Sequence, residues 1–227
     1  MPTELIVVLD VDTRERALGI VEASAGCDWY KIGSQLFTRC GPDIVREIQG
    51  MGKNVFLDLK FHDIPNTVAS AARAAADLGV VLFTLHACGG RRMIEEARKS
   101  VEGTATRILA VTVLTSLSEA MLRNEIGIAE TPGQAVVRFA RQSVDSGAHG
   151  IVCSPLELRM VREAVGSAPA LVAPGIRPQW ASGDDQVRVM TPREAAAAGA
   201  NFIVVGRPIL KHESPAEAVR LIREEMA

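Results

Sequence analysis

The sequence is poor in aromatic residues, which make up 4% of the chain and include one tyrosine and two tryptophans. Hydrophobic residues still reach 48%, so aliphatic side chains must form most of the core. Neither sign of charge is in excess, because the formal net charge is -2 over 227 residues. This balance argues against general binding to nucleic acid or to an anionic membrane. Any site for an anion must therefore be local.

Two further absences concern metal chemistry and location. The four cysteines include no C-x-x-C pair and lack the spacing of a zinc or disulfide module, so we expect reduced thiols. No apolar run approaches the roughly 20 residues of a membrane span, and the first residues show no signal-peptide pattern. We therefore expect a cytoplasmic protein that does not enter a membrane.

What the sequence does have is a regular alternation of two kinds of segment. Short runs rich in Val, Ile and Leu recur eight times, at residues 4–10, 29–33, 54–60, 80–87, 107–115, 150–154, 170–175 and 202–207. Segments with helical spacing lie between them, at residues 14–25, 42–52, 67–79, 91–101, 132–147, 155–165, 191–200 and 214–227. Several helical segments close on a glycine where a C-cap is expected, as at Gly50, Gly79 and Gly147.

Strictly alternating strands and helices predict parallel strands joined by crossover helices. Eight such units in 227 residues predict an α/β fold of the (β/α)8 TIM barrel type, with a single domain over residues 1–227. The rival is an open doubly wound sheet, but no G-x-G-x-x-G motif follows the first apolar run. In a TIM barrel the chemistry lies at the C-terminal ends of the strands, so polar residues there are the candidates.

The third apolar run ends in the stretch DLKFHD, which places Asp58, Lys60 and Asp63 within six positions. Side chains two positions apart share one face of a strand, so Asp58 and Lys60 should both point into the barrel mouth. Two like charges repel by roughly 4 kcal/mol at 4 Å and an effective dielectric constant of 20. Interleaved lysines relieve this repulsion. We therefore predict an array of two acids and two bases, completed by Lys31 from the neighbouring strand.

Each of these residues also has a structural interpretation. Lys60 could belong to a structural ion pair, and Asp63 could cap the helix that begins near Pro65. The complete constellation favours a catalytic site. For His62 and His86, by contrast, we favour the structural interpretation, in which they order the loop and the end of the strand.

A second candidate site follows the last two strands. Gly206 and Arg207 come directly after the eighth apolar run, and this fold often binds phosphate beyond its seventh and eighth strands. A long stretch containing Gly and Pro separates the seventh strand from its helix, as lids and binding loops do. Arg177 and Gln186 lie on that stretch and could close over a ligand.

These motifs, taken in order, resemble the orotidine 5′-phosphate decarboxylase family over essentially the whole chain. The matching stretches are LDVD, YKIGSQLF, DLKFHDIPNTV, HACGG, VTVLTS, VAPGIRP, GDDQVRVMTP and VVGRPI. The resemblance implies a carboxy-lyase that converts orotidine 5′-monophosphate into uridine 5′-monophosphate and CO2, the final step of de novo pyrimidine biosynthesis. It also implies a homodimer with shared active sites, without a metal or an organic cofactor.

The same resemblance implies a role for each matching residue. Lys60 resembles the proton donor to C6 of the pyrimidine, and Asp58 the acid set against the substrate carboxylate. Lys31 resembles the partner lysine that also reaches the ribose. Asp63 and Thr67 resemble the pair that each subunit contributes to its neighbour's site. The other matches are expected to bind substrate: Asp10 at the ribose, Thr115 and Ser116 at the pyrimidine, and Arg177, Gln186, Gly206 and Arg207 at the phosphate and lid.

Two other functions stay open at this point. A magnesium-dependent sugar-phosphate decarboxylase or aldolase of the same superfamily resembles this chain in the D-x-K-x-x-D pattern. It has a glutamate where Lys31 stands, so the lysine argues against it. A non-catalytic barrel that senses a nucleotide would need Gly206 and Arg207 but not the charged residues of the third strand.

Overall fold

The computed structural model describes residues 2–24, 26–181 and 190–226. Within these residues, eight parallel strands close into a barrel in which each strand pairs with the next and β8 pairs with β1. The strands are β1 (Glu4–Val8), β2 (Trp29–Gly33), β3 (Asn54–Phe61), β4 (Leu82–His86), β5 (Arg107–Val111), β6 (Gly150–Val152), β7 (Ala170–Ala173) and β8 (Phe202–Val205). The predicted TIM barrel is therefore confirmed.

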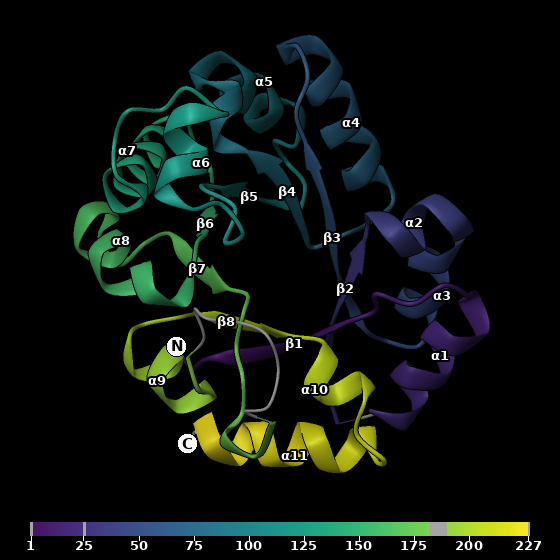
Figure 1. Cartoon of the computed structure of the whole chain (residues 1–227). Helices are drawn as coiled ribbons and strands as arrows, with labels where there is room; N and C mark the ends of the chain where they lie inside the picture. The colour runs from purple at the N-terminus through teal and green to yellow at the C-terminus, as the bar shows by residue number, and fades with distance from the viewer. Residues whose placement is uncertain (1, 25, 182–189, 227) are drawn as a thin grey trace.

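Helices surround the strands, as Figure 1 shows in a view along the barrel. They are α1 (Arg14–Ala23), α2 (Ser34–Cys40), α3 (Asp43–Gly50), α4 (Pro65–Asp77), α5 (Arg91–Ser100), α6 (Glu119–Asn124), α7 (Pro132–Asp145), α8 (Leu158–Val165), α9 (Pro192–Ala197), α10 (Arg207–Leu210) and α11 (Pro215–Met226). Short 3₁₀ helices lie at Ala87–Gly89, Pro155–Glu157 and Gln179–Ala181. Helices α2, α6 and α10, which are only seven, six and four residues long, were not predicted from the sequence.

Local signals explain where several helices begin and end. Helices α7 and α9 each start with a capping box and a proline in the first turn, which satisfy or remove otherwise unpaired N–H groups. Just beyond α4 and α7, Gly79 and Gly147 adopt the positive φ expected of a helix stop, at 75° and 93°. The prediction for Gly50 is wrong. Gly50 is the last residue of α3, and Gly52 has the positive φ, at 76°.

Alternation along the strands divides the apolar core into two layers. Residues that point into the barrel form the inner layer: Ile6, Val8, Phe56, Leu82, Leu109, Val172 and Val204. Strand residues that point outward, such as Leu5, Val7 and Ile32, belong to the larger layer beneath the helices. Both faces of the sheet are thus covered, which explains why the strands are nearly continuous apolar runs.

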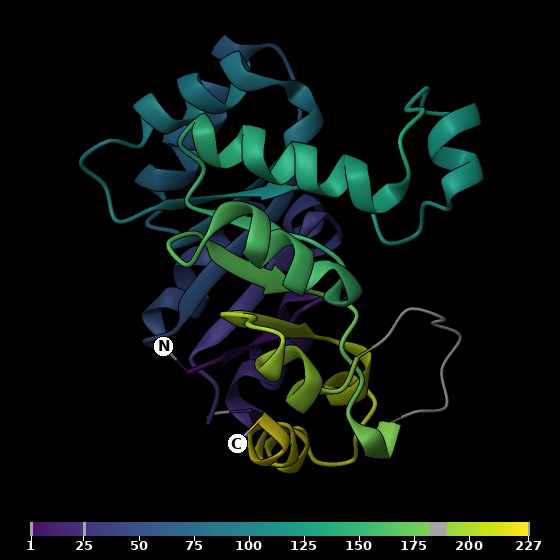
Figure 2. The same ribbon diagram turned by 90° about the vertical axis from the view of Figure 1, so that its left-hand side faces the viewer.

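All strands point toward one end of the barrel, where the loops that follow them form a mouth. In Figure 2, α6 stands out beyond the body of the protein at this end. It lies in the connection between β5 and α7, which also carries Thr115 and Ser116. None of the helices in the described part of the chain is long and apolar enough to cross a membrane.

Candidate active site

Four charged side chains of alternating sign form a chain across the mouth of the barrel. Lys31 Nζ lies 3.1 Å from Asp10 Oδ1 and 3.3 Å from Asp58 Oδ2. Lys60 Nζ lies 2.8 Å from both carboxylate oxygens of Asp58. Each carboxylate is therefore followed by an ammonium, which offsets the repulsion between the acids and between the bases.

Gly33 makes room for one end of this array. A Cβ atom at Gly33 would lie 2.8 Å from Lys31 Nζ and 2.9 Å from Asp10 Oδ1, closer than a real side chain allows. Gly33 was not predicted from the sequence as a site residue. A signal was present, because Gly33 follows Lys31 at the two-residue spacing that puts both on one face of β2.

The end of β3 departs from regular strand geometry at Lys60. The pairing of β3 with β4 shifts between Leu57 and Phe61, so residues 58–60 lie opposite Thr84 alone. Lys60 has a φ of 52° and is the one non-glycine residue with positive φ in the described part of the chain. This conformation costs an L-residue about 1–2 kcal/mol. In this conformation the ammonium of Lys60 contacts the carboxylate of Asp58.

Asp58 is an enclosed acid, with a side chain that is 12% exposed. Burial by itself would raise the pKa of Asp58. The charges of Lys31 and Lys60, with hydrogen bonds from Lys60 and Thr84, outweigh burial and hold that pKa below its usual value. Asp58 is therefore ionised at neutral pH.

Asp63 does not contribute to this array within the same chain. Its exposed carboxylate accepts a hydrogen bond from the backbone N–H of Ile64 at 2.6 Å. The second acid of the array is instead Asp10, from the loop after β1. The pattern of the third strand had predicted Asp63 in this role. Thr67, in the first turn of α4, is exposed as well.

Two histidines lie beside the array. The rings of His62 and His86 are 5.6 Å apart, and His86 is the last residue of β4. Burial lowers the pKa of His86, and the nearby His62 and Lys60 lower it further. His86 is therefore mainly neutral at pH 7.

A pocket of about 210 Å³ lies over the array at the mouth of the barrel. Its lining combines three of the four charged residues with a mainly apolar remainder: Lys31, Asp58, Lys60, Phe56, Val111, Val113, Leu114, Thr115, Val152, Cys153, Pro174 and Val204. Apolar surroundings strengthen the field that these charges exert on a bound molecule. Burial also raises the pKa of the Cys153 thiol, which stays protonated.

The other predicted site residues fall into different environments. Thr115 lines the pocket, and Ser116 follows it on the same exposed loop. Arg177 is buried, where an open binding loop was expected, and its guanidinium donates to the carbonyl oxygen of Ile176 at 3.0 Å. Gln186 lies outside the described residues.

The predicted phosphate residues stand at the end of β8. Arg207 is the first residue of α10 and Gly206 is its N-cap, where a loop was expected. A Cβ atom at Gly206 would lie 3.1 Å from Cβ of Val8, so this turn passes close to the first strand. The TIM-barrel fold commonly binds phosphate at a short extra helix in this position.

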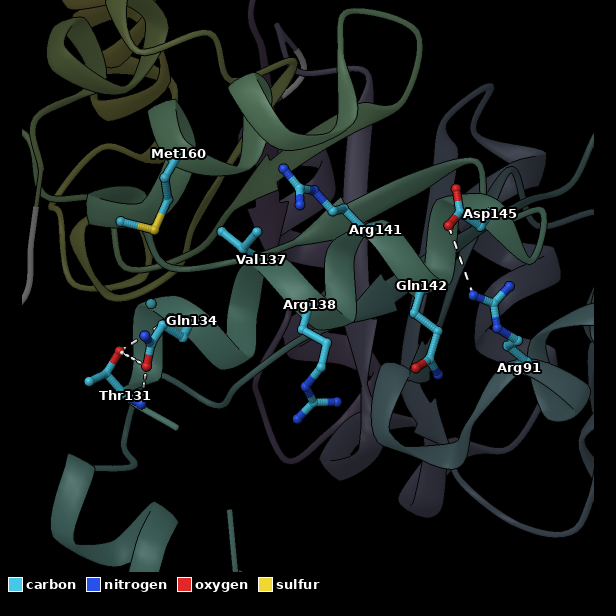
Figure 3. A pocket seen from close by; sticks show the side chains of 10 residues that line it. Arg91, Thr131, Gln134, Val137, Arg138, Arg141, Gln142, Asp145 and Met160 are labelled. Atoms are coloured by element: carbon cyan, nitrogen blue, oxygen red, sulfur yellow. Dashed lines mark hydrogen bonds and ion pairs between the residues drawn. The ribbon is translucent and has the colours of Figure 1, made fainter. Parts of the chain in front are cut away.

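A larger hollow, of about 770 Å³, lies on the outer helical shell. Figure 3 shows Arg138 and Arg141 on opposite sides of α7, and Arg91 turned toward Asp145. Arg138 donates to both carboxylate oxygens of Glu130 at 2.9 Å, and Arg91 lies 4.0 Å from Asp145. The arginines of this hollow are thus partly paired with acids, and no residue of the charged array at the barrel mouth lines the hollow. The convergence of charge, rather than the size of the hollow, identifies the candidate site.

No three His, Cys, Asp or Glu side chains of residues 2–24, 26–181 and 190–226 converge in a group that could hold a metal ion. At the barrel mouth, the position between the carboxylates of Asp10 and Asp58 is taken by the ammonium of Lys31.

Comparison with known proteins identifies relatives over the whole chain. Residues 3–222 match the family described as Orotidine 5′-phosphate decarboxylase / HUMPS family. A relative named orotidine 5′-phosphate decarboxylase from Opitutus terrae is 50% identical over 229 residues, covering 100% of this chain and 99% of the relative. One of the same name from Heliobacterium modesticaldum is 50% identical over 231 residues, covering 98% and 95%. The crystal structure of orotidine 5′-phosphate decarboxylase from Lactobacillus acidophilus matches with a TM-score of 0.88 and 37% identity, covering 99% of both chains.

Proposed function

Because this chain belongs to the orotidine 5′-phosphate decarboxylase / HUMPS family, we propose that it converts orotidine 5′-monophosphate into uridine 5′-monophosphate and CO2. The protein is thus a carboxy-lyase of pyrimidine biosynthesis. The observation that carries the proposal is the array of Asp10, Lys31, Asp58 and Lys60 beneath the pocket at the barrel mouth. The proposal includes a cytoplasmic location and no nucleic-acid partner.

Lys60 is the proposed proton donor. When the bond between C6 and the carboxylate carbon breaks, CO2 leaves and the electron pair stays on C6. The pair takes a proton from the Lys60 ammonium, which solvent later restores. No organic cofactor serves as an electron sink in this scheme, so preorganised charge must stabilise the developing anion. The contact at 2.8 Å with Asp58 holds the ammonium in place before substrate arrives.

Asp58 is proposed to face the carboxylate that leaves. Its pKa lies below the usual value, so the residue presents a negative charge at neutral pH. Repulsion between the two carboxylates disappears when neutral CO2 departs, so it favours the reaction in the forward direction. Binding energy from the distant phosphate offsets this repulsion in the bound substrate.

The remaining contacts are assigned by resemblance and supported by position. Asp10 and Lys31 would hold the ribose, because their ion pair lies at the edge of the array. Thr115, which lines the pocket, and the adjacent Ser116 would meet the pyrimidine. The phosphate would be bound by residues at and near the turn after β8 and on the loop after β7: Arg177, Gln186, Gly206 and Arg207.

We also propose a homodimer in which each subunit completes the other's site. Asp63 and Thr67 are the residues proposed to cross the interface. Both are exposed, and Ile64 between them is 67% exposed, an unusual position for a large apolar side chain. Burial of Ile64 against a second subunit would carry Asp63 into the neighbouring mouth.

The magnesium-dependent alternative is disfavoured by the place of Lys31. Its ammonium lies within 3.3 Å of both Asp10 and Asp58 and supplies the positive charge that a cation would bring there. A barrel that only binds nucleotides has no use for an array built around a nearly buried pair of Lys31 and Asp58. Structural ion pairing would not require Lys60 to adopt a positive φ.

The experiment is a turnover assay on the purified protein with orotidine 5′-monophosphate and excess chelator. Loss of substrate absorbance, with uridine 5′-monophosphate identified by chromatography, is the expected result. Turnover that requires magnesium, or turnover of sugar phosphates instead, would favour the superfamily alternative. Tight binding of nucleotide by well-folded protein without product would favour the non-catalytic barrel.

A further inference from the structure

We propose that Thr84 is a positioning residue, whose single hydroxyl group holds Lys60 and Asp58 in the arrangement that decarboxylation requires. The inference rests on the proposed function of the site. Thr84 lies in the middle of β4, points to the same side of the strand as the inner-layer residue Leu82, and is 1% exposed. It does not line the pocket, so it acts through the residues that do.

The two hydrogen bonds of Thr84 Oγ1 have fixed directions. The backbone N–H of Lys60 can only donate, so the hydroxyl oxygen accepts it, at 2.9 Å. The hydroxyl proton then remains for Asp58 Oδ1, which lies 2.9 Å away and can only accept when ionised. One group thus joins the backbone of the proposed proton donor to the carboxylate beside its ammonium.

The shifted pairing of β3 explains why Lys60 depends on a side chain. In a regular parallel ladder, backbone N–H groups bond to carbonyl oxygens of the neighbouring strand. Where residues 58–60 lie opposite Thr84 alone, the N–H of Lys60 bonds to the threonine hydroxyl instead. This bond ties the left-handed conformation of Lys60 to the rigid wall of the barrel.

The same hydroxyl also controls where the ammonium can go. Lys60 Nζ contacts both oxygens of Asp58, and Thr84 fixes one of these oxygens. Without the hydroxyl, the backbone N–H of Lys60 and the carboxylate of Asp58 would each lose a hydrogen bond. The phosphate is proposed to bind elsewhere, at the turn after β8, so substrate binding should depend little on Thr84. Misplacement of the Lys60 ammonium should therefore lower kcat far more than it raises KM.

The test compares Thr84→Val, which keeps the shape but lacks the hydroxyl, with Thr84→Ser, which keeps the hydroxyl. We expect Thr84→Val to lower kcat about 10- to 100-fold, because a hydrogen bond to a charged group is lost and a buried N–H is left unpaired. KM should stay within about threefold of wild type, and Thr84→Ser should restore kcat to within about threefold. A wild-type kcat for Thr84→Val, or a loss equally large in Thr84→Ser, would overturn the proposal.

Thr106→Val is the matched control. Thr106 is 4% exposed, and its hydroxyl donates to the carbonyl oxygen of Val80 at 2.7 Å, just before the start of β5 and away from the mouth. Its replacement should lower thermal stability and leave kcat unchanged. If Thr84→Val and Thr106→Val lower kcat equally, the effect is general destabilisation and the proposal fails. Should Thr84→Val not fold, Thr84→Ala carries the same comparison.

A second readout does not depend on turnover. Hydrogen exchange of the Lys60 amide, followed by NMR, should speed up in Thr84→Val and stay slow in Thr84→Ser and Thr106→Val. An inactive wild-type protein with this exchange pattern would reject the proposed function while upholding the hydrogen-bonding role of Thr84. Unchanged exchange in Thr84→Val would overturn the role of Thr84, whatever the protein turns over.

Discussion

Lys31→Met tests whether the array is held together by charge. Methionine keeps the length and apolar stem of the side chain but removes the ammonium from between Asp10 and Asp58. At 3.3 Å and an effective dielectric constant of 20, the attraction between Lys31 and Asp58 is about 5 kcal/mol before desolvation is subtracted. Both side chains are close to 90% buried, at 11% and 12% exposed, whereas Asp10 is 49% exposed and adds little.

Breaking a buried pair typically costs about 3–5 kcal/mol. Lys60 and Thr84 remain as partners of Asp58, so we expect a smaller loss, of about 2–3 kcal/mol in the free energy of unfolding at pH 7. The loss depends on pH. The folded protein lowers the pKa of Asp58 from its usual 3.8, so ionised Asp58 contributes stability above that pH and loses it as the pH falls through the folded pKa.

Removing Lys31 raises the pKa of Asp58 in the folded protein, so the deficit of Lys31→Met should be largest at neutral pH. It should shrink below about pH 4, where Asp58 becomes protonated in the variant and in the unfolded chain. Urea denaturation of wild type and variant at several pH values between 7 and 3.5 measures this. Lys99→Met, which breaks an exposed pair with Glu96, is the control and should be nearly neutral. A deficit that is independent of pH, or no deficit at all, would show that the Lys31 charge does not hold the array together.

Three further predictions concern the same site. In urea denaturation, the free energy of unfolding of Lys60→Gly should be about 1 kcal/mol higher than that of Lys60→Ala, because glycine accepts the φ of 52° without strain and alanine does not. Equal free energies of unfolding would contradict strain at this position. Gly33→Ala should lower kcat/KM at least about 10-fold, because the new Cβ displaces the flexible end of Lys31 from the array; an unchanged kcat/KM would remove Gly33 from the site. Mixing inactive Lys60→Ala with inactive Asp63→Ala should restore some activity, since one site of a mixed dimer carries neither change; no recovery despite confirmed subunit exchange would rule out a shared site.

The barrel could be predicted from the sequence because its determinants are local and repeated. Each strand is a short apolar run, since both faces of the sheet are buried, and each long helix carries its own spacing and caps. Helices α2, α6 and α10 were missed because at most seven residues give only about two turns of spacing; α9, with six residues, was predicted because its sequence is rich in alanine. The error at Gly50 has a different origin, since moving a helix end by two residues leaves the pattern almost unchanged.

The candidate site was predictable in its residue types but not in its connections. Asp58, Lys60 and Lys31 stand out as charges at strand ends. Which acid completes the array depends on where the loop after β1 runs, so Asp10 could not be chosen over Asp63 from spacing. The positive φ of Lys60 arises from the shifted pairing of β3 with β4, which no short motif encodes. Thr84 could not be singled out from the sequence, because a threonine within an apolar strand is common.

The role of Lys60 as proton donor is tested most directly by measuring both the turnover of Lys60→Ala and its affinity for uridine 5′-monophosphate. We expect kcat to fall by at least about 100-fold while the nucleotide still binds, because the ammonium that protonates C6 is gone and the phosphate contacts remain. The wild-type protein, assayed with excess chelator, provides the reference rate. Substantial turnover by well-folded Lys60→Ala would contradict the assignment of Lys60 as the proton donor.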